Sequence, residues 1–527
     1  MRLRRVIMVL TVNSIAIAVI YGFTAGFMSI GALIRERSLS RADTSIGTDD
    51  AKMLFDKKLL VDRDKYDASL EKVKEKYRRL KTSNPTLYLK VPEGEFVKSI
   101  IYFFVIAPNL GKKKVVLDDT IVQGFRKQGI VLYSMDKNYP LMKKSIYLDG
   151  SGGGYPKPTI RRGTNFIIIF VESLSQFFLR EDVHGVKGLT PTIAEIGRGS
   201  MKFTRMINAS YPTLKGLIAA LGSTVYLLDE SIGGTRITVP CRFLFLSNIL
   251  KAMGYATIHM QAGSERFIGM KDMFTKRQGY DLFYGSESLA IRNIASMKGG
   301  FGVDDEILFQ AVVEWLDTYD NKKPFLLTIS TINTHPPFKV RYRAPQSKGS
   351  DLLDSLYSTD RAIGLLWDYF KTSKYRHNTV VILTADHAMG NCKDYNEFAG
   401  RFEEYYHPFF DIIPCMVRFP DGAPWNGVAV DTSCTSLDFL PTILDMMNID
   451  LPNPFMGLSI FGDRRRIAAS STGGGNNLMA GISKEGEFDP SKIDRATFEQ
   501  AKKVIDFFFN IYTTDSILPP DYRVRLH

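Results

Sequence analysis

The stretch "NFIIIFVES", Asn165 to Ser173, decides the fold class of this chain. Residues 166–171 are all apolar, with no polar residue at alternate positions. Such a run is typical of a strand that is buried on both faces, as strands are in a parallel sheet. The run stops at Glu172, and a buried carboxylate is rare unless it is paired or binds a metal.

Three further stretches of this kind follow along the chain, and a helical pattern precedes each of them. The strand-like stretches are "YATIHM" (255–260), "PFLLTIST" (324–331) and "TVVILTADH" (379–387). The helical patterns cover residues 242–254, 306–319 and 360–371. This alternation predicts an α/β fold with a mostly parallel sheet flanked by helices.

Polar side chains lie where the predicted strands end. They are Glu172, His259, Asn333 to His335, and Asp386 with His387. In parallel sheets of this kind, ligands bind beyond the carboxyl ends of the strands. We therefore expect these side chains to share one site.

The N-terminus predicts a membrane anchor. Basic residues 1–5 precede residues 6–34, which carry no charge. Roughly 20 apolar residues span a bilayer, so we expect one uncleaved transmembrane helix or signal anchor. A cleaved signal peptide and a buried helix are the alternatives. We assign residues 35–160 to a juxtamembrane stem and linker, 161–465 to a catalytic domain, and 466–527 to a C-terminal segment with a terminal amphipathic helix.

The composition limits the class of partner. Hydrophobic residues make up 45% and aromatic residues 12% of the chain, which suits a large globular core. The net charge of +12 suits nucleic acid, anionic lipid or an anionic substrate. The basic residues are scattered and we find no nucleic-acid motif, so we expect a membrane and an anionic lipid headgroup or ester, and no nucleic acid.

Asp386 and His387 stand side by side where a buried strand stops, and such a pair is a good ligand set for a divalent cation. The alternative is a helix-capping Asp beside a solvent-exposed His, and Glu172 has a capping alternative as well. His335 lies in "NTHPPF", a turn forced by two prolines. It either binds an anion or acts as an acid, or it is a surface-loop His.

The stretch "SYPTLKG" (210–216) places two hydroxyls, Ser210 and Thr213, just before an apolar helix. The helix dipole and an adjacent cation activate a hydroxyl in this position, and the amides of the first turn can hold an anionic group. A helix N-cap is the alternative. Together with the carboxylate and the Asp-His pair, this stretch predicts a metal-assisted site for phosphoryl or sulfuryl transfer.

The order and spacing of these motifs resemble the alkaline phosphatase superfamily, and within it the sulfatase-type enzymes. The resemblance covers about 165–460. It also includes "LTPTIAEIG" (189–197), "QGYDLFYG" (278–285), "FGVDDEILF" (301–309), "YSTDRAIG" (357–364), "PFFDIIPCMVRFPDG" (408–422) and "SLDFLPTILDMMNI" (436–449).

Within this superfamily, the chain resembles one branch more than another. Sulfatases have two aspartates after the first strand and an Arg that follows Cys/Ser-x-Pro-Ser/Thr, whereas this chain has Glu172-Ser173 and Leu214. Phosphoglycerol transferases of the lipoteichoic-acid-synthase and osmoregulated-glucan type look closer. Their Glu-Ser matches Glu172-Ser173, and their Thr-x-basic-Gly matches Thr213 to Gly216.

The resemblance implies a role for each candidate residue. One Mn²⁺ or Mg²⁺ would be held by Glu172, Thr213, Asp386 and His387, with Ca²⁺ or Zn²⁺ as alternatives; the hard oxygens with a single His favour the first two metals. Thr213 would be the nucleophile, with Ser210 as runner-up, and His335 would bind the phosphate or protonate a leaving oxygen. Further substrate contacts would come from Lys215, Arg266, His259 and Gln261.

The function implied by the resemblance is a membrane-tethered, metal-dependent phosphotransferase whose catalytic domain faces the extracytoplasmic or lumenal side. It would move a phosphoglycerol-type or phosphoethanolamine-type headgroup through a phospho-threonine. One alternative is a sulfatase or phosphodiesterase of the same fold. Another is a non-catalytic receptor or scaffold, against which the intact ligand set argues.

Overall fold

The computed structural model describes residues 138–147, 157–225, 242–290, 302–320, 322–390, 392–402, 411–432, 434–462, 468–472, 478–482 and 515–524. The strands are β1 (Asn165–Val171), β2 (Met201–Phe203), β3 (Met206–Ile207), β4 (Ala256–Gln261), β5 (Leu282–Tyr284), β6 (Phe325–Ser330), β7 (Thr379–Ala385), β8 (Cys415–Arg418), β9 (Ala429–Val430), β10 (Cys434–Thr435), β11 (Ala468–Thr472) and β12 (Leu478–Ile482). The helices are α6 (Glu181–His184), α7 (Pro191–Arg198), α8 (Thr213–Gly222), α9 (Leu246–Ala252), α10 (Met270–Asp272), α11 (Ser286–Ala290), α12 (Asp305–Thr318), α13 (Asp351–Thr372), α14 (Lys393–Ala399) and α15 (Phe439–Met446).

Within the described residues, eight strands form one sheet in the order β5-β4-β6-β1-β7-β8-β2-β9. β1 lies between β6 and β7 and is parallel to both, and β4 and β5 continue the parallel arrangement. β8 pairs antiparallel with β7 on one side and with β2 on the other. The predicted α/β fold with a mostly parallel sheet is confirmed, and the four predicted strands are β1, β4, β6 and β7.

The apolar run of β1 is buried on both faces of the sheet. Ile167 and Ile169 share a small apolar cavity with side chains of α7 and α13. Phe170 points to the opposite face and packs against Phe439 of α15, with 6.2 Å between the ring centroids. A fully buried side chain of this size contributes roughly 1.5–3 kcal/mol. The sequence therefore shows no polar alternation here, because neither face of the strand meets water.

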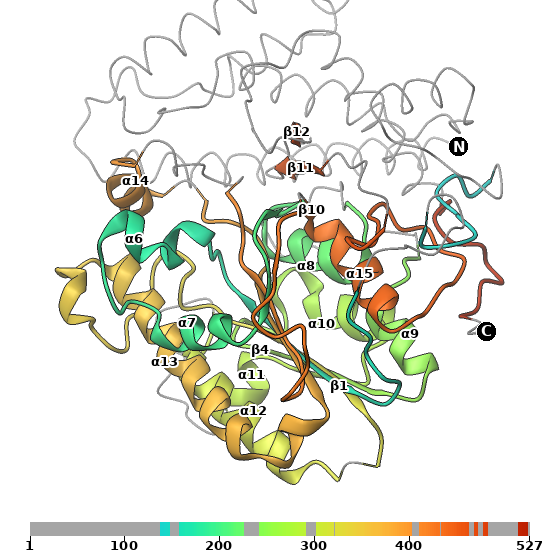
Figure 1. Cartoon of the computed structure of the whole chain (residues 1–527), viewed down its shortest axis with the longest axis horizontal. Coiled ribbons are helices and arrows are strands. Elements are labelled where there is room, and N and C mark those ends of the chain that lie inside the picture. The colour runs from blue at the N-terminus through green and yellow to red at the C-terminus, as the bar shows by residue number, and fades with distance from the viewer. Residues whose placement is uncertain are drawn as a thin grey trace, which may run out of the picture. The chain divides into compact units, whose positions relative to one another are not determined.

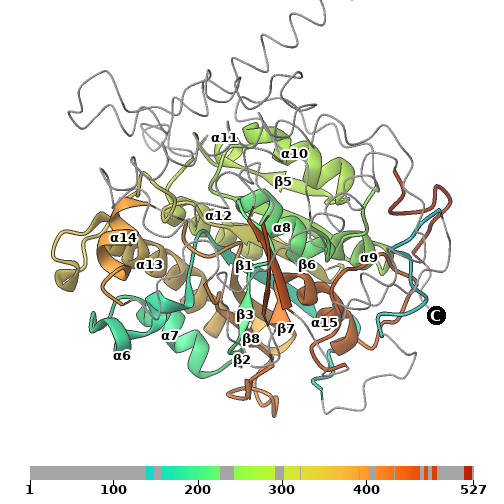
Figure 2. The same ribbon diagram turned by 90° about the horizontal axis from the view of Figure 1, so that it is seen from above.

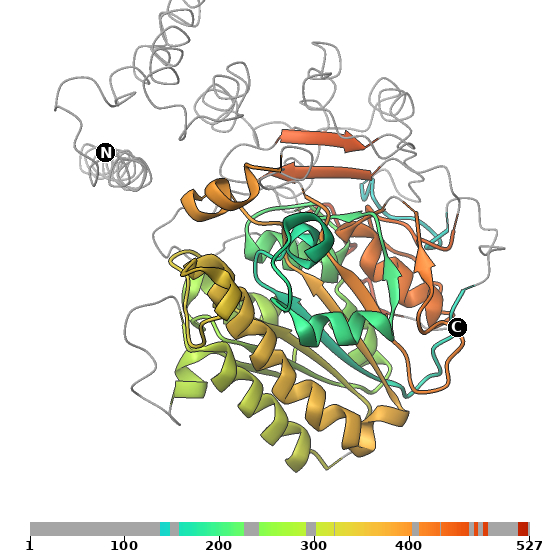
Figure 3. The ribbon, with the colours of Figure 1, turned by 60° about the vertical axis from the view of Figure 1, so that its left-hand side comes forward.

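Two groups of helices cover the two faces of this sheet. Helices α7 and α12 both pack against α13 on one face, and α8, α9 and α15 lie on the other (Figure 1). Helices α12 and α13, yellow-green and gold, run side by side (Figure 3). α8 contacts both α9 and α15, and Figure 2 shows these helices from above.

The parallel register brings the ends of the central strands to one edge. Val171 pairs with Ala385, so the residues that follow them, Glu172 and Asp386, leave the sheet side by side. β6 ends at Ser330 on the other side of β1. This edge, where the expected site residues meet, is the one to which α8 delivers its first turn.

Several predictions concern segments outside the described residues. The expected transmembrane helix (6–34), most of the stem and linker (35–160), and the terminal amphipathic helix belong to these segments. Among the helices that are described, none has the length and apolar character needed to cross a membrane. The domain boundaries remain predictions.

Candidate active site

Glu172 is the first residue after β1, and its backbone is bonded to the segment that follows β6. Its N–H donates to Thr331 Oγ1 over 2.9 Å, and Thr334 Oγ1 donates to its carbonyl oxygen. The next residue, Ser173, has φ 55°, in the left-handed region, and donates from Oγ to Glu172 Oε1 over 2.7 Å. The carboxylate is thus fixed by backbone bonds and by its neighbour.

Asp386 and His387 follow β7 and turn toward Glu172. Asp386 Oδ1 accepts from the N–H of Ser173 over 3.0 Å and from that of His387 over 2.8 Å. Asp386 Oδ2 lies 3.3 Å from His387 Nε2 and makes no hydrogen bond with the described residues. His387 Nδ1 lies 2.8 Å from the carbonyl oxygen of Ala388, so that its Nε2 faces the two carboxylates.

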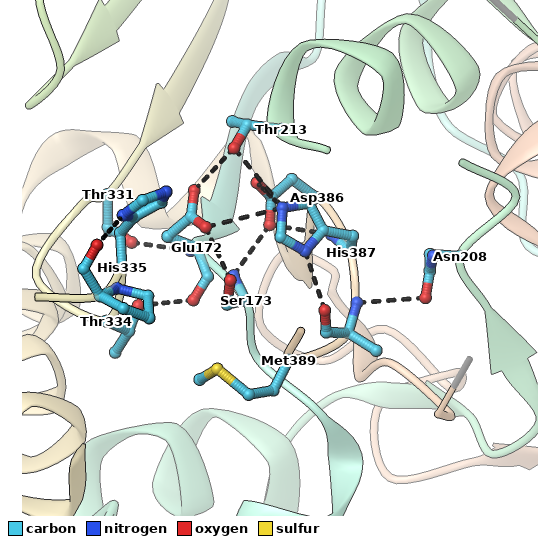
Figure 4. Close-up of polar contacts among 12 residues, drawn as sticks. Glu172, Ser173, Asn208, Thr213, Thr331, Thr334, His335, Asp386, His387 and Met389 are labelled. Atoms are coloured by element: carbon cyan, nitrogen blue, oxygen red, sulfur yellow. Dashed lines mark hydrogen bonds and ion pairs between the residues drawn. The ribbon is translucent and has the colours of Figure 1, made fainter. Parts of the chain in front are cut away.

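Thr213 is the first residue of α8, and its hydroxyl points at this group (Figure 4). Thr213 Oγ1 donates to Glu172 Oε2 over 3.0 Å and lies 3.5 Å from His387 Nε2. The N-cap position belongs to Pro212, which makes no side-chain cap bond. The helix comes this close because residue 216 is glycine, where a Cβ would overlap the carbonyl group of Asp386.

Burial and mutual charge govern the titration of these groups. Burial raises the pKa of Glu172, but the charges of His387 and His335 and the bond from Ser173 outweigh it, so the pKa lies below its usual value. Burial and the negative charge of Glu172 hold the pKa of Asp386 well above its usual value. Burial lowers the pKa of His387 and so favours the neutral imidazole, which is the form that binds metals.

The donor set fits a divalent cation. One ligand atom each from Glu172, Asp386 and His387 lies within 4.8 Å of the others, and all three residues are buried. The oxygen Asp386 Oδ2, buried and without a hydrogen bond to the described residues, is the kind of donor that a bound cation would satisfy. Two carboxylates, a hydroxyl and one imidazole suit Mn²⁺ or Mg²⁺.

His335 lies beside Glu172, across from His387 (Figure 4). It is half-buried in the loop after β6, and its N–H donates to the carbonyl oxygen of Ile332 over 2.9 Å. Its Nδ1 lies 2.6 Å from the carbonyl oxygen of Pro336. The charge of His335 is one of the influences that lower the pKa of Glu172.

Not every expected substrate contact lies with this group. His259 is fully buried in the sheet, its ring 4.0 Å from that of Phe274. Its Nδ1 lies 2.8 Å from Thr328 Oγ1 and its Nε2 3.3 Å from Gln261 Oε1. Burial lowers the pKa of His259 to about 3. Both ring nitrogens are engaged inside the protein, so the structure places His259 in the core and not in the cluster.

The three other expected contacts differ in exposure. Gln261, at the end of β4, is buried, and its Nε2 donates to the carbonyl oxygen of Ser264 over 2.9 Å. Lys215 is 4% exposed within α8. Arg266 is exposed in the loop after β4. The structure therefore groups Glu172, Thr213, Asp386 and His387, with His335 beside Glu172.

Sequence reasoning missed the residues that hold the cluster together. Asn208 is fully buried; its Oδ1 accepts from the N–H of Ala388 over 3.1 Å, and its Nδ2 donates to the carbonyl oxygen of Ser210 over 3.2 Å. The ring of Tyr211 meets that of His387 edge-on at 4.6 Å. The one available signal was proximity to Thr213 in sequence.

Comparison with known proteins gives the family context. A family model described as Sulfatase matches residues 164–449, which contain β1, α8 and β7. Relatives named phosphoglycerol transferase I include one from Xanthomonas campestris pv. campestris, 24% identical over 253 residues, and one from Escherichia fergusonii, 27% identical over 263 residues. The matches cover 45% and 47% of this chain, and 35% and 33% of the relatives, so the chain spans about a third of their length.

Two solved structures share the fold. A protein of the alkaline phosphatase superfamily from Vibrio parahaemolyticus is 19% identical with a TM-score of 0.57, covering 78% of this chain and 100% of the other. A lipoteichoic acid synthase from Listeria monocytogenes is 16% identical with a TM-score of 0.52, covering 75% and 98%. The expected superfamily and its sulfatase-type branch are confirmed.

Proposed function

The chain belongs to the sulfatase family, and from this premise we propose that it is a metal-dependent phosphotransferase with Thr213 as its nucleophile. The group transferred would be a phosphoglycerol-type or phosphoethanolamine-type headgroup, carried on Thr213 as a phospho-threonine. The names of the relatives support the first of these headgroups.

The contacts of the Thr213 hydroxyl carry this proposal. Its oxygen donates to Glu172 over 3.0 Å and lies 3.5 Å from His387 Nε2, inside the buried ligand set. Ser210 is 1% exposed, and its carbonyl oxygen accepts from Asn208. Leu214, where a sulfatase would have arginine, is 1% exposed and apolar. These features favour Thr213 over Ser210 as nucleophile and phosphate over sulfate as the transferred group.

We further propose that Glu172, Asp386, His387 and the Thr213 oxygen hold one divalent cation, Mn²⁺ or Mg²⁺. Such a cation lowers the pKa of a bound hydroxyl and offsets negative charge on the phosphoryl oxygens. The protein supplies the orientation: Ser173 bonds to both carboxylates, and the carbonyl oxygen of Ala388 fixes the imidazole of His387.

The reaction divides into two displacements at phosphorus. Thr213 Oγ1 gives up its proton to solvent and forms a bond to phosphorus, while the bond from phosphorus to the lipid oxygen breaks and that oxygen takes up a proton. His335, which lies beside Glu172, would hold the phosphate or give a proton to that leaving oxygen. An acceptor hydroxyl then loses its proton and attacks phosphorus, the bond from phosphorus to Thr213 Oγ1 breaks, and Oγ1 takes up a proton to become a hydroxyl again. The first turn of α8, whose N-cap makes no side-chain bond, directs its amides toward the phosphate oxygens.

The cellular setting is also a proposal. Residues 6–34 would anchor the chain in a membrane, with the catalytic domain on the extracytoplasmic or lumenal side, where lipid headgroups are within reach. The net charge of +12 favours an anionic lipid surface.

A substrate panel in the presence of Mn²⁺ tests the proposal. A fluorescent phosphatidylglycerol analogue and an aryl sulfate are compared for the wild type, Thr213→Ala and Ser210→Ala. We expect headgroup release that is lost in Thr213→Ala only, together with a phosphoglycerol adduct on Thr213 in mass spectra of the quenched wild type. Aryl sulfate turnover that depends on Ser210 would instead identify a sulfatase. Release that persists in Thr213→Ala would exclude Thr213 as the nucleophile.

A further inference from the structure

Asp305 is a buried carboxylate outside the ligand set, at the first position of α12. Its Oδ1 accepts from the N–H of Ile332 over 2.8 Å, and its Oδ2 accepts from the N–H of Asn333 over 3.2 Å. Thr359 Oγ1, on α13, donates to the same Oδ2 over 2.8 Å. The N–H of Asp305 donates in return to Asn333 Oδ1 over 3.3 Å. Asp305 thus joins the α12–α13 layer to the loop after β6.

That loop carries His335, and it is fixed from two sides. The N–H of His335 bonds to the carbonyl oxygen of Ile332, which closes a turn whose start is held by Asp305. On the other side, the hydroxyls of Thr331 and Thr334 bond to the backbone of Glu172. The position of His335 relative to the ligand set therefore depends on the bonds to Asp305 as well as on the bonds to the backbone of Glu172.

The desolvation cost of burying the Asp305 carboxylate suggests that this residue holds the loop in one position. Burial raises the pKa of Asp305 to about 7, although the bonds from Thr359, Ile332 and Asn333 lower it. A buried carboxylate is a costly way to bond a loop, since a neutral side chain would avoid the desolvation. Costs of this kind are expected where a functional side chain must be held in one geometry.

We propose that Asp305 is a positioning residue for His335, holding the Ile332–His335 turn so that the imidazole faces Glu172 and Thr213. This inference rests on the proposed function, in which His335 contacts the phosphate or protonates the leaving oxygen. Asp305 touches no reacting atom itself. Its effect on the reaction passes entirely through the loop.

The test is a double-mutant cycle with a matched control. Asp305→Asn keeps the size of the side chain but places an N–H₂ group where one oxygen now accepts bonds. Asp304→Asn removes the same charge one residue earlier, at the N-cap of α12, where Asp304 accepts from the N–H of Glu306 over 2.9 Å. Asn caps helices about as well as Asp, so this control should retain activity and melting temperature.

The variants are assayed with a lipid phosphodiester, which has a poor leaving group, and with a nitrophenyl phosphodiester, which has a good one. General acids contribute about 10²–10⁴-fold, so we expect His335→Ala to lower kcat on the lipid by at least about 10²-fold. Asp305→Asn should shift the ratio of the two kcat values in the same direction. In the His335→Ala background, Asp305→Asn should change kcat by less than about 3-fold further, because the effects of two residues are not additive when one acts through the other.

Two outcomes would overturn the inference alone: a full, additive effect of Asp305→Asn in the His335→Ala background, or a loss that leaves the substrate ratio at its wild-type value. If Asp305→Asn does not fold, Thr359→Val removes one donor to the carboxylate and should show the same substrate pattern more weakly. Undiminished activity of Thr213→Ala in the same panel would instead overturn the proposed function, and the inference with it.

Discussion

Gly216 sets how closely α8 approaches the backbone of Asp386 after β7, and Gly216→Ala tests the candidate site directly. An ideal Cβ at this position would lie 2.8 Å from the carbonyl carbon of Asp386. Carbon atoms pack favourably at about 3.5–4.0 Å. The first turn of α8 would therefore have to retreat by roughly 0.7 Å or more, and Thr213 lies in that turn.

The expected effect is larger on activity than on stability. Replacing a helix glycine with alanine gains about 1 kcal/mol of helix propensity, while overpacking costs about 1–3 kcal/mol. The net change in the free energy of unfolding is thus roughly 0–2 kcal/mol. A misplacement of about 1 Å in a catalytic group costs on the order of 10²-fold in rate. We expect Gly216→Ala to lower kcat about 10²-fold while the melting temperature falls by only a few degrees.

Gly364→Ala is the matched control. Gly364 lies inside α13, and its Cβ would meet only the side-chain oxygen of Thr192 at 3.2 Å. Because a side chain can yield, this variant should keep wild-type activity and an equal or higher melting temperature. Both variants are assayed for headgroup release with Mn²⁺, for Mn²⁺ affinity by calorimetry, and for thermal unfolding. Wild-type activity in Gly216→Ala would refute the argument that the close approach of α8 forms the site.

Three further predictions concern the metal, a buried amide and a buried acid. Treatment with EDTA should abolish headgroup release and added Mn²⁺ should restore it; full activity after chelation would contradict a metal site. Asn208→Ala should lower the free energy of unfolding by about 1–3 kcal/mol in denaturant titrations, because the N–H of Ala388 loses its acceptor; an unchanged free energy of unfolding would contradict the importance of this bond. Burial raises the pKa of Asp360 to about 6, so the folded state binds its proton more tightly than the unfolded chain and loses stability as pH rises from about 4 to 6. At 1.36 kcal/mol per pKa unit, this difference amounts to at most about 3 kcal/mol. As the pH rises from about 4 to 6, the free energy of unfolding of Asp360→Asn should therefore increase relative to that of the wild type by up to this amount. A constant difference between the two proteins across this pH range would disprove the prediction.

The fold class could be predicted from the sequence because the continuous apolar runs of the strands and the helical spacing of apolar residues between them were both clear. The continuous apolar run of β1 and the helical patterns before β4, β6 and β7 arise from local geometry and burial, which a linear pattern records. The short strands β2 and β8, which extend the sheet antiparallel beyond β7, were not predicted. Strands of three or four residues carry too little pattern to be recognised.

The candidate site was partly readable. Glu172, Asp386 and His387 were recognisable because each follows directly on a buried strand, and parallel strands end at one edge. His259 was predicted for the same reason, yet its side chain lies in the core, in contact with the rings of Phe274 and Phe283. Successive side chains of a strand face opposite sides of the sheet. The sequence of β4 did not show whether the side chain of His259 faces the core or the site.

The sequence by itself determined the α/β class, the strand ends that carry the candidate ligands, and the two candidate hydroxyls. The resemblance in sequence already ranked Thr213 above Ser210, and the tertiary structure adds the contacts: it brings Thr213 to Glu172 and His387, because Gly216 lets α8 reach the backbone of Asp386. It alone revealed Asn208 and Asp305 as the supports of the two loops. These roles arise from contacts between segments about 30 to 180 residues apart, and no local pattern records such contacts.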